Sequence, residues 1–434
     1  MRIGRSLPPA AAPIGPREFF SGICGLFQGG KALDRFRLEL KEYFAVKHCF
    51  VVSSGKAAFT LILLALEELF PGRDEVIIPA FTCYSVPSSV VRAGLRIRLC
   101  DLHHDSLDLD FAQLSAMLSA AKRPKRADAR LPGGLTHLQG ESWNGACSSR
   151  DSIGRVLAVV PTHLYGYPSD VLKVRELIQD GAVTIIEDAA QAMGETWEGR
   201  KLGTRGDVGF LSLGRGKALS TVEGGVILTN RDDIADVLRR RVDGLPGYGI
   251  WGLLKLNLKA LGLMIFLHPR LFWIPRSLPF LRLGETLFER DFPILRMSPF
   301  QAGLAENWRE RLEHMRDARN ANVKQWRRIL EEIGGRASWL PHSRSLGLLR
   351  YPIRVGDPTC RASLLKESGA RGAGVVPVYP QSINSLPELK GEIPAQACPV
   401  AEHYARELVT LPTHDYLEGK DVAIVRRLLS NALN

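Results

Sequence analysis

Cysteine is scarce in this sequence of 434 residues, and no two cysteines form a C-x-x-C pair. The seven are Cys24, Cys49, Cys83, Cys100, Cys147, Cys360 and Cys398. An odd number at wide spacing predicts neither a disulfide framework nor a structural zinc site, and it favours a reducing compartment. The N-terminal segment MRIGRSLPPAAAPIGP also lacks the continuous apolar core of a secretory signal. We therefore expect a cytoplasmic protein without a bound metal ion.

Acidic side chains are too few to balance the basic ones, because 57 Lys and Arg against 46 Asp and Glu give a net charge of +11. Such an excess favours anionic partners such as nucleotides and phosphorylated substrates. The basic residues are scattered, apart from a cluster at 122–130 whose Ala-, Gly- and Pro-rich surroundings indicate a solvated loop. Zinc-finger spacing, RNA-binding aromatic signatures and basic zippers are missing, so we expect no nucleic-acid partner.

A long uninterrupted apolar run is also missing. The most apolar segment, 249–268 (GIWGLLKLNLKALGLMIFLH), contains Lys255 and Lys259 and is followed by Pro269, which argues against a membrane-spanning helix. The pattern predicts an amphipathic helix, and there are two alternatives for what covers its apolar side. We favour the interface of a dimer, and the alternative is peripheral contact of 249–283 with a membrane surface, with the lysines reaching the headgroups.

Short apolar runs that alternate with helical patterns dominate the first half of the chain. The runs are CFVVSSG, EVIIPA, LRIRLCDL, RVLAVVPTHLYG and AVTIIEDAA. Continuous apolar strands of this kind are typical of a parallel sheet covered on both faces by helices. The sequence therefore predicts an α/β fold.

The length is that of two or three domains. We expect an N-terminal arm and helix over 1–45 and a large domain over 46–248, with an inserted loop at 121–154. An apolar insertion over 249–299 would then lead into a smaller α+β C-terminal domain over 300–434, which ends in a helix.

One carboxylate and one amine stand out at predicted strand ends. Asp188 closes a buried strand, and Lys217 follows 29 residues later in a Gly-rich turn. The pair suits pyridoxal phosphate, because a carboxylate keeps the pyridine nitrogen protonated and a lysine amine bonds to the cofactor and moves a proton. On spacing alone, a surface Asp and Lys near ordinary strand ends are equally consistent. The GRGK at 214–217 lacks the Gly and Ser or Thr of a nucleotide-triphosphate loop, since Leu211 and Ala218 stand there.

Six motifs together resemble the DegT/StrS-type sugar-nucleotide aminotransferases, a branch of the fold-type I pyridoxal-phosphate enzymes. In chain order they are SSGKAAF (53–59), DEVIIPAFTC (74–83), THLYG (162–166), IEDAAQA (186–192), GDVGFLSLGRGKALSTVEGG (206–225) and LPTH (411–414). The resemblance covers about four-fifths of the chain. It implies a large domain with a mostly parallel sheet of the seven-stranded type, a smaller C-terminal α+β domain, and a homodimer.

The resemblance also implies roles for individual residues. Lys217 would be the Schiff-base lysine, Asp188 would pair with the pyridine nitrogen, and Gln191 would approach the ring hydroxyl. Ser212 would donate to the cofactor phosphate. The turn of Ser54, Gly55, Lys56 and Ala57 would cradle the same phosphate at a helix N-terminus.

Several positions depart from the family pattern. Lys56 replaces a phosphate-contacting Thr, and Ile294 replaces an Asn that reaches the partner's cofactor phosphate, so Lys56 is a candidate substitute donor. Cys83 stands where an aromatic residue stacks on the ring, and Tyr84 follows it. If this segment is strand-like, adjacent side chains face opposite ways and Tyr84 does not substitute. The substrate-pocket candidates are His163, Tyr165 and Arg296, with a hydrogen-bonded structural role equally open for His163.

The reaction implied by the resemblance is transfer of an amino group from glutamate to the keto group of a nucleotide-linked sugar, for amino sugars of surface polysaccharides. Two alternatives stay open. The same family contains sugar 3-dehydratases, which replace the Schiff-base lysine with histidine, and Lys217 argues against that activity. A non-catalytic, cofactor-binding or regulatory relative is the other.

Overall fold

The computed structural model describes residues 3–120, 155–278, 286–334 and 347–433. Its centre is a seven-stranded sheet in the order β1-β9-β8-β5-β4-β2-β3. Only β9 runs antiparallel to its neighbours, so the other six strands point the same way and end at one edge. The strands are β1 (His48–Val52), β2 (Arg73–Pro79), β3 (Arg96–Cys100), β4 (Arg155–Val159), β5 (Thr184–Asp188), β8 (Val208–Ser212) and β9 (Gly225–Thr229).

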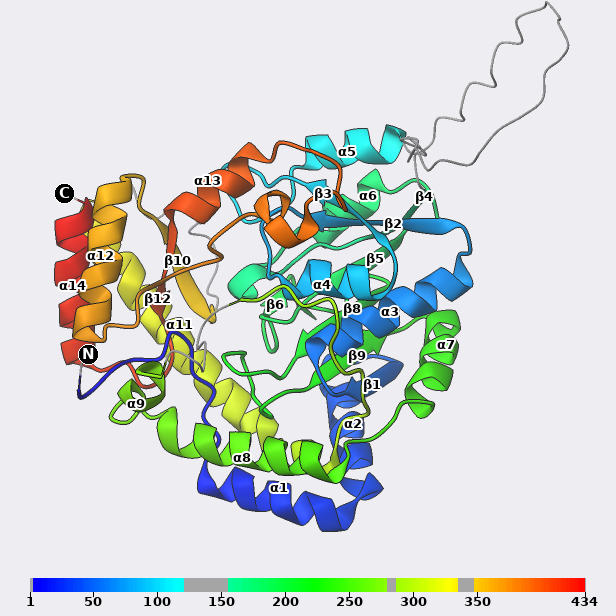
Figure 1. Cartoon of the computed structure of the whole chain (residues 1–434), viewed down its shortest axis with the longest axis horizontal. Helices are drawn as coiled ribbons and strands as arrows, with labels where there is room; N and C mark the ends of the chain where they lie inside the picture. The colour runs from blue at the N-terminus through cyan, green and yellow to red at the C-terminus, as the bar shows by residue number, and fades with distance from the viewer. Residues whose placement is uncertain (1–2, 121–154, 279–285, 335–346, 434) are drawn as a thin grey trace, which may run out of the picture.

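Helices cover both faces of this sheet, as the apolar strands require (Figure 1). All five residues of β5 and of β9 are buried. The helices of this part are α1 (Pro16–Gln28), α2 (Gly30–Phe44), α3 (Gly55–Leu69), α4 (Ser85–Arg92), α5 (Phe111–Ala120), α6 (Val171–Leu177) and α7 (Asp232–Asp243). A two-stranded hairpin, β6 (Thr196–Trp197) and β7 (Arg200–Lys201), lies outside the main sheet. The α/β prediction is confirmed.

The C-terminal part contains a small antiparallel sheet in the order β10-β12-β11. Its strands are β10 (Arg350–Arg354), β11 (Val376–Pro377) and β12 (Leu408–Pro412), and its helices are α12 (Pro358–Arg371), α13 (Pro399–Glu407) and α14 (Gly419–Leu433). Between the two sheets come α8 (Ile250–Phe266), α9 (Trp273–Arg276), α10 (Pro299–Leu304) and the 25-residue α11 (Trp308–Glu332). Trp308 of α11 packs with the N-terminal helices, whereas Trp326 packs with the small sheet, so this helix joins the two parts.

The segment before α1 runs across the molecule and is held by the last elements of the chain. The Arg5 guanidinium lies 2.8 Å from the carboxylate of Asp421 in α14. The Pro8 carbonyl lies 2.8 Å from Nε2 of the buried His414. This N-terminal arm therefore belongs structurally to the C-terminal part as well as to the helix that follows it. The inserted loop predicted at 121–154 lies outside the described residues.

Candidate active site

The turn between β1 and α3 lies against the end of β8 and forms the candidate phosphate cradle. Ser54 caps α3, and its Oγ accepts the N–H of Ala57 at 3.1 Å. A Cβ on Gly55 would lie 2.8 Å from Cβ of Ser212, so only glycine allows the helix to start this close to β8. The predicted phosphate residues Ser54, Gly55, Ala57 and Ser212 are thereby brought together. The N-terminus of a 15-residue helix favours an anion there.

Asp188 ends β5 at the same edge of the sheet and is only 5% exposed. Its Oδ1 accepts the N–H of Ala190 at 3.0 Å. Burial raises the pKa of this carboxyl, while the Ala190 N–H and the positive charge of Lys217 counteract the shift. A buried carboxylate that accepts so few hydrogen bonds from the protein would be stabilised by a cationic partner. A protonated pyridine nitrogen would be such a partner.

Two buried hydroxyls that follow neighbouring strands of the sheet have no hydrogen-bond partner among the described residues. They are Oγ1 of Thr82, which follows β2, and Oγ1 of Thr162, whose backbone pairs with Asp188. Buried polar groups in native proteins are almost always satisfied, by water or a ligand where the protein itself offers nothing. The orphaned hydroxyls, the cradle at Gly55 and the isolated carboxylate all fit a bound polar, anionic cofactor.

Lys217 lies in the turn after β8, and its charge is near enough to Asp188 to act on it. The backbone N–H of Lys217 donates to the Gly214 carbonyl at 3.3 Å. The next carbonyl, that of Ala218, accepts from the Arg319 guanidinium at 3.2 Å. Arg319 is 2% exposed, and burial lowers its pKa to about 10 although Glu195 and Asp415 oppose this. Arg319 therefore holds the lysine turn from 101 residues away, a role that no sequence motif signalled.

Gln191 and Tyr165 meet in one hydrogen-bond network rather than in an open pocket. The Gln191 Oε1 accepts the N–H of Tyr165 at 3.1 Å, and its Nε2 donates to the Tyr379 hydroxyl at 3.0 Å. Tyr165 is buried at a φ of 58°, a strained value for a residue with a side chain. Burial lowers the pKa of Arg350, whose charge is felt by both tyrosines. Tyr379 and Arg350 were missed because they belong to the C-terminal part of the chain.

The strand-like geometry expected around Cys83 and Tyr84 is wrong. Residues 80–84 form a turn that leads into α4, and Tyr84 lies at its N-cap with helical φ and ψ. The alternation argument therefore does not apply. The Tyr84 side chain is buried, and its hydroxyl donates to the Gln381 carbonyl at 3.0 Å and accepts the Gln381 N–H at 2.9 Å. The Cys83 thiol lies 3.4 Å from the Ser85 hydroxyl.

His163 is fully buried, with both ring nitrogens engaged inside the protein. Its Nδ1 accepts the N–H of Ser169 at 3.0 Å, so the proton lies on Nε2 and is shared with Glu187 at 2.9 Å. Glu187 also accepts backbone N–H groups from Gly203, at 2.9 Å, and from Gly206. These contacts favour the structural role over the substrate-lining one. They also identify Glu187, inside the IEDAAQA motif, as the residue that braces the turn before β8.

Glu187→Ala is expected to destabilise the protein by about 3–5 kcal/mol at neutral pH, because it leaves His163 and several buried N–H groups unpaired. Burial opposes ionisation of Glu187, but the His163 hydrogen bond and the backbone donors together lower its pKa. A lowered folded-state pKa gives stability that is complete above about pH 5 and is lost as the pH falls below about 4. Urea unfolding of wild type and variant across this range measures both effects. A loss below about 1 kcal/mol at neutral pH would contradict the bracing role.

The side chain of Lys56 is directed to another segment. Its ammonium pairs with the Glu289 carboxylate and lies 4.6 Å from the centre of the Phe292 ring. Ile294 packs against the core, and the neighbouring Arg296 is exposed, with its backbone N–H bonded to the Pro246 carbonyl at 3.0 Å. Lys56 and Arg296 therefore lie at the edge of the cradle, on the side formed by the segment after α9.

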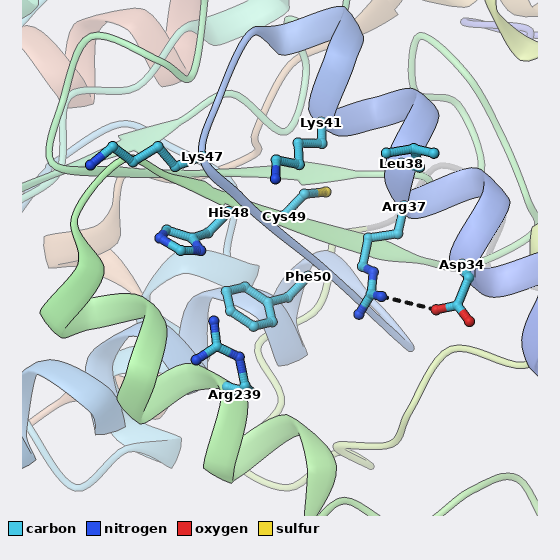
Figure 2. Close-up of a pocket in the computed structure, with 9 residues that line it drawn as sticks. All are labelled: Asp34, Arg37, Leu38, Lys41, Lys47, His48, Cys49, Phe50 and Arg239. Atoms are coloured by element: carbon cyan, nitrogen blue, oxygen red, sulfur yellow. Dashed lines mark hydrogen bonds and ion pairs between the residues drawn. The ribbon is translucent and has the colours of Figure 1, made fainter.

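A separate hollow of about 430 Å³ lies at the start of β1, with the side chains that line it shown in Figure 2. The Gly55 turn follows the other end of this strand. It is lined by Asp34, Arg37, Leu38, Lys41, Lys47, His48, Cys49, Phe50 and Arg239. Most of its basic side chains are already paired: Arg37 with Asp34, Lys47 and His48 with Asp232, and Arg239 with Asp236. None of the predicted site residues lines this hollow, so it is distinct from the candidate active site.

Comparison with known proteins identifies the family to which this chain belongs. The model of the DegT/DnrJ/EryC1/StrS aminotransferase family matches residues 24–129, 147–249 and 294–429. The chain belongs to this family. Its members include pyridoxal-phosphate-dependent sugar aminotransferases. The family model leaves 250–293 unmatched, a stretch that includes α8 and α9.

Relatives in the DegT/DnrJ/EryC1/StrS family include more than one activity. The GDP-perosamine synthase of Caulobacter vibrioides is 27% identical over 93% of this chain and 91% of that protein. The GDP-4-keto-6-deoxy-D-mannose 3-dehydratase of Yersinia pseudotuberculosis is 23% identical over 49% of this chain and 47% of that protein. The solved aminotransferase PseC of Helicobacter pylori, involved in pseudoaminic acid biosynthesis, superposes with a TM-score of 0.73 at 16% identity over 99% of both chains.

Proposed function

We propose that this chain transfers an amino group from glutamate to the keto group of a nucleotide-linked sugar, as a homodimer that uses pyridoxal phosphate. The observation that carries the proposal is the placing of Lys217, Asp188 and the Gly55 cradle at one edge of one sheet. The full-length similarity to a GDP-perosamine synthase supports a nucleotide-sugar acceptor. The net charge of +11 suits an anionic substrate of this class.

Each residue of the site has a distinct task in this proposal. When bound, the cofactor supplies an electron sink for the carbon that gains or loses the amino group. Ser54, Gly55 and Ser212 would hold its phosphate, and Asp188 would keep its ring nitrogen protonated. The Lys217 Nζ would bond to the cofactor and then carry the proton between the two carbons of the exchange. Arg319 fixes the backbone next to Lys217 and so limits the positions its amine can reach.

The amino donor and the competing activities are tested by one spectroscopic experiment. Purified protein loaded with pyridoxal phosphate is expected to absorb in the visible and to lose that band on addition of glutamate, with one equivalent of 2-oxoglutarate released. Glutamine and aspartate serve as matched donors. A protein that keeps its band with every donor would be a non-catalytic relative. A protein that releases water from a keto-deoxy sugar without releasing an amino sugar would be a dehydratase.

Lys56→Ala is expected to weaken cofactor binding by no more than about fivefold, because the Lys56–Glu289 pair is partly exposed and such pairs contribute about 1 kcal/mol or less. Titration of the apoenzyme with pyridoxal phosphate measures the affinity, and Glu289→Gln is the matched control. If Lys56 acts only through Glu289, the two variants behave alike. A loss far above fivefold for Lys56→Ala alone would assign the Lys56 ammonium to the cofactor phosphate.

A further inference from the structure

The helices α1 and α8 lie side by side at one edge of the molecule (Figure 1). Together they expose several large apolar side chains. Their inner sides pack together, with Leu256 and Ala260 of α8 against Phe19 and Ile23 of α1. Their outer sides carry large apolar residues that are 40–86% exposed. This α1–α8 face consists of Phe20, Phe27, Ile250, Trp251, Leu254, Leu258 and Ile265.

The spacing of these residues is helical on both elements. Trp251, Leu254, Leu258 and Ile265 recur at positions that share one side of α8, and Phe20 and Phe27 do the same on α1. Large exposed apolar patches are rare on the free surface of globular proteins and mark a site of contact. None of the helices in the described part of the chain is long and apolar enough to cross a bilayer.

The charges around this face indicate the kind of partner that it binds. From 244 to 278 the chain contains no Asp or Glu, while Lys255, Lys259, Arg270 and Arg276 supply only positive charge. Lys255 and Arg270 are exposed beside the apolar stripe, and Arg17 is exposed next to Phe20. Lys259 is paired with Glu223 at 3.6 Å, which leaves Lys255, Arg270 and Arg17 as the exposed cations beside this face. An apolar face flanked by exposed basic side chains complements anionic lipid headgroups over acyl chains.

A second copy of the chain is the weaker alternative. The family model matches neither α8 nor the first half of α1, so all of this face except Phe27 lies outside the shared scaffold on which a family-wide dimer would depend. A self-complementary interface would also bring the exposed basic side chains of the two copies close to one another. We propose that the α1–α8 face docks this enzyme on an anionic membrane surface, with Trp251 and Leu258 inserted below the headgroups.

The test uses the cofactor-loaded, full-length protein and flotation with two kinds of vesicle, phosphatidylcholine alone and phosphatidylcholine mixed with phosphatidylglycerol. The protein is expected to float with the anionic vesicles, and less so as salt is raised. Trp251→Glu combined with Leu258→Glu should reduce this binding by at least about tenfold, because two apolar side chains can no longer be buried. Leu172→Glu, an equally drastic change at an exposed leucine of α6, is the control and should float like wild type.

The cofactor band, its loss with glutamate and the molar mass in solution are recorded for every variant, so failure here is separable from failure of the proposed reaction. The proposal is overturned if the wild type ignores anionic vesicles, or if the double variant floats like wild type. It is also overturned if the double substitution halves the molar mass, because the face would then be an interface between two copies.

Discussion

Lys217→Ala is expected to lower amino-group transfer by at least about 10⁴-fold while the fold stays intact, since one side chain serves both as the covalent link and as the proton carrier. The residue lies in a turn whose shape is set by backbone contacts, through Gly214 on one side and Arg319 on the other. Removal of its side chain therefore leaves the turn in place.

The measurement is the rate of 2-oxoglutarate release together with the visible spectrum of the loaded protein. The exposed neighbour Arg215, changed to alanine, is the matched control and should keep near-normal turnover. The unfolding midpoint of both variants should lie close to that of wild type. Near-normal transfer by Lys217→Ala would remove this residue from the mechanism, whatever the spectrum showed.

Asp188→Asn is expected to slow transfer by about 10²–10⁴-fold, which corresponds to the roughly 3–5 kcal/mol lost when one member of a buried charge pair is removed. The amide has the shape of the carboxylate but cannot hold a proton on the pyridine nitrogen by charge. Burial of Asp188 makes the effect large, because no water is available to replace the missing negative charge.

The pH dependence of the cofactor spectrum distinguishes this role from a structural one. In wild type the ring nitrogen should stay protonated over the accessible range, whereas in Asp188→Asn it should lose its proton at much lower pH. Unfolding in urea should be little changed, because the one hydrogen bond given to Oδ1 can be accepted equally by the amide oxygen. A rate within a few-fold of wild type would refute the electron-sink assignment.

The sequence was sufficient to predict elements whose signal is local. The apolar run ending in Asp188 indicated a buried strand, and the SSGKAA turn before an apolar helical pattern indicated a helix N-terminus. The order of the strands in the sheet was not readable, since the antiparallel insertion of β9 between β1 and β8 depends on packing between segments far apart in the chain.

Predictions about single side chains were weaker wherever the residue that each one contacts lies far away in the sequence. His163 was a candidate for substrate contact because it follows a strand end, yet Glu187 engages it from the neighbouring strand. Tyr84 was interpreted in a strand that the chain does not form, because the turn at 80–84 is fixed by contacts with Gln381. The role of Arg319 could not be predicted, because its partner is a backbone carbonyl and every residue of the chain has one.

The N-terminal arm has a consequence for how the protein is made. Residues 5–11 are synthesised hundreds of residues before their partners Asp421, His414 and Arg319. The strands of the large sheet are therefore complete before these partners of the arm have been synthesised. Docking of the arm brings the Ala11 carbonyl to the same guanidinium that holds Ala218. Truncation before His414 would therefore remove two partners of the arm, whereas Arg319 would still be present to hold the turn that carries Lys217.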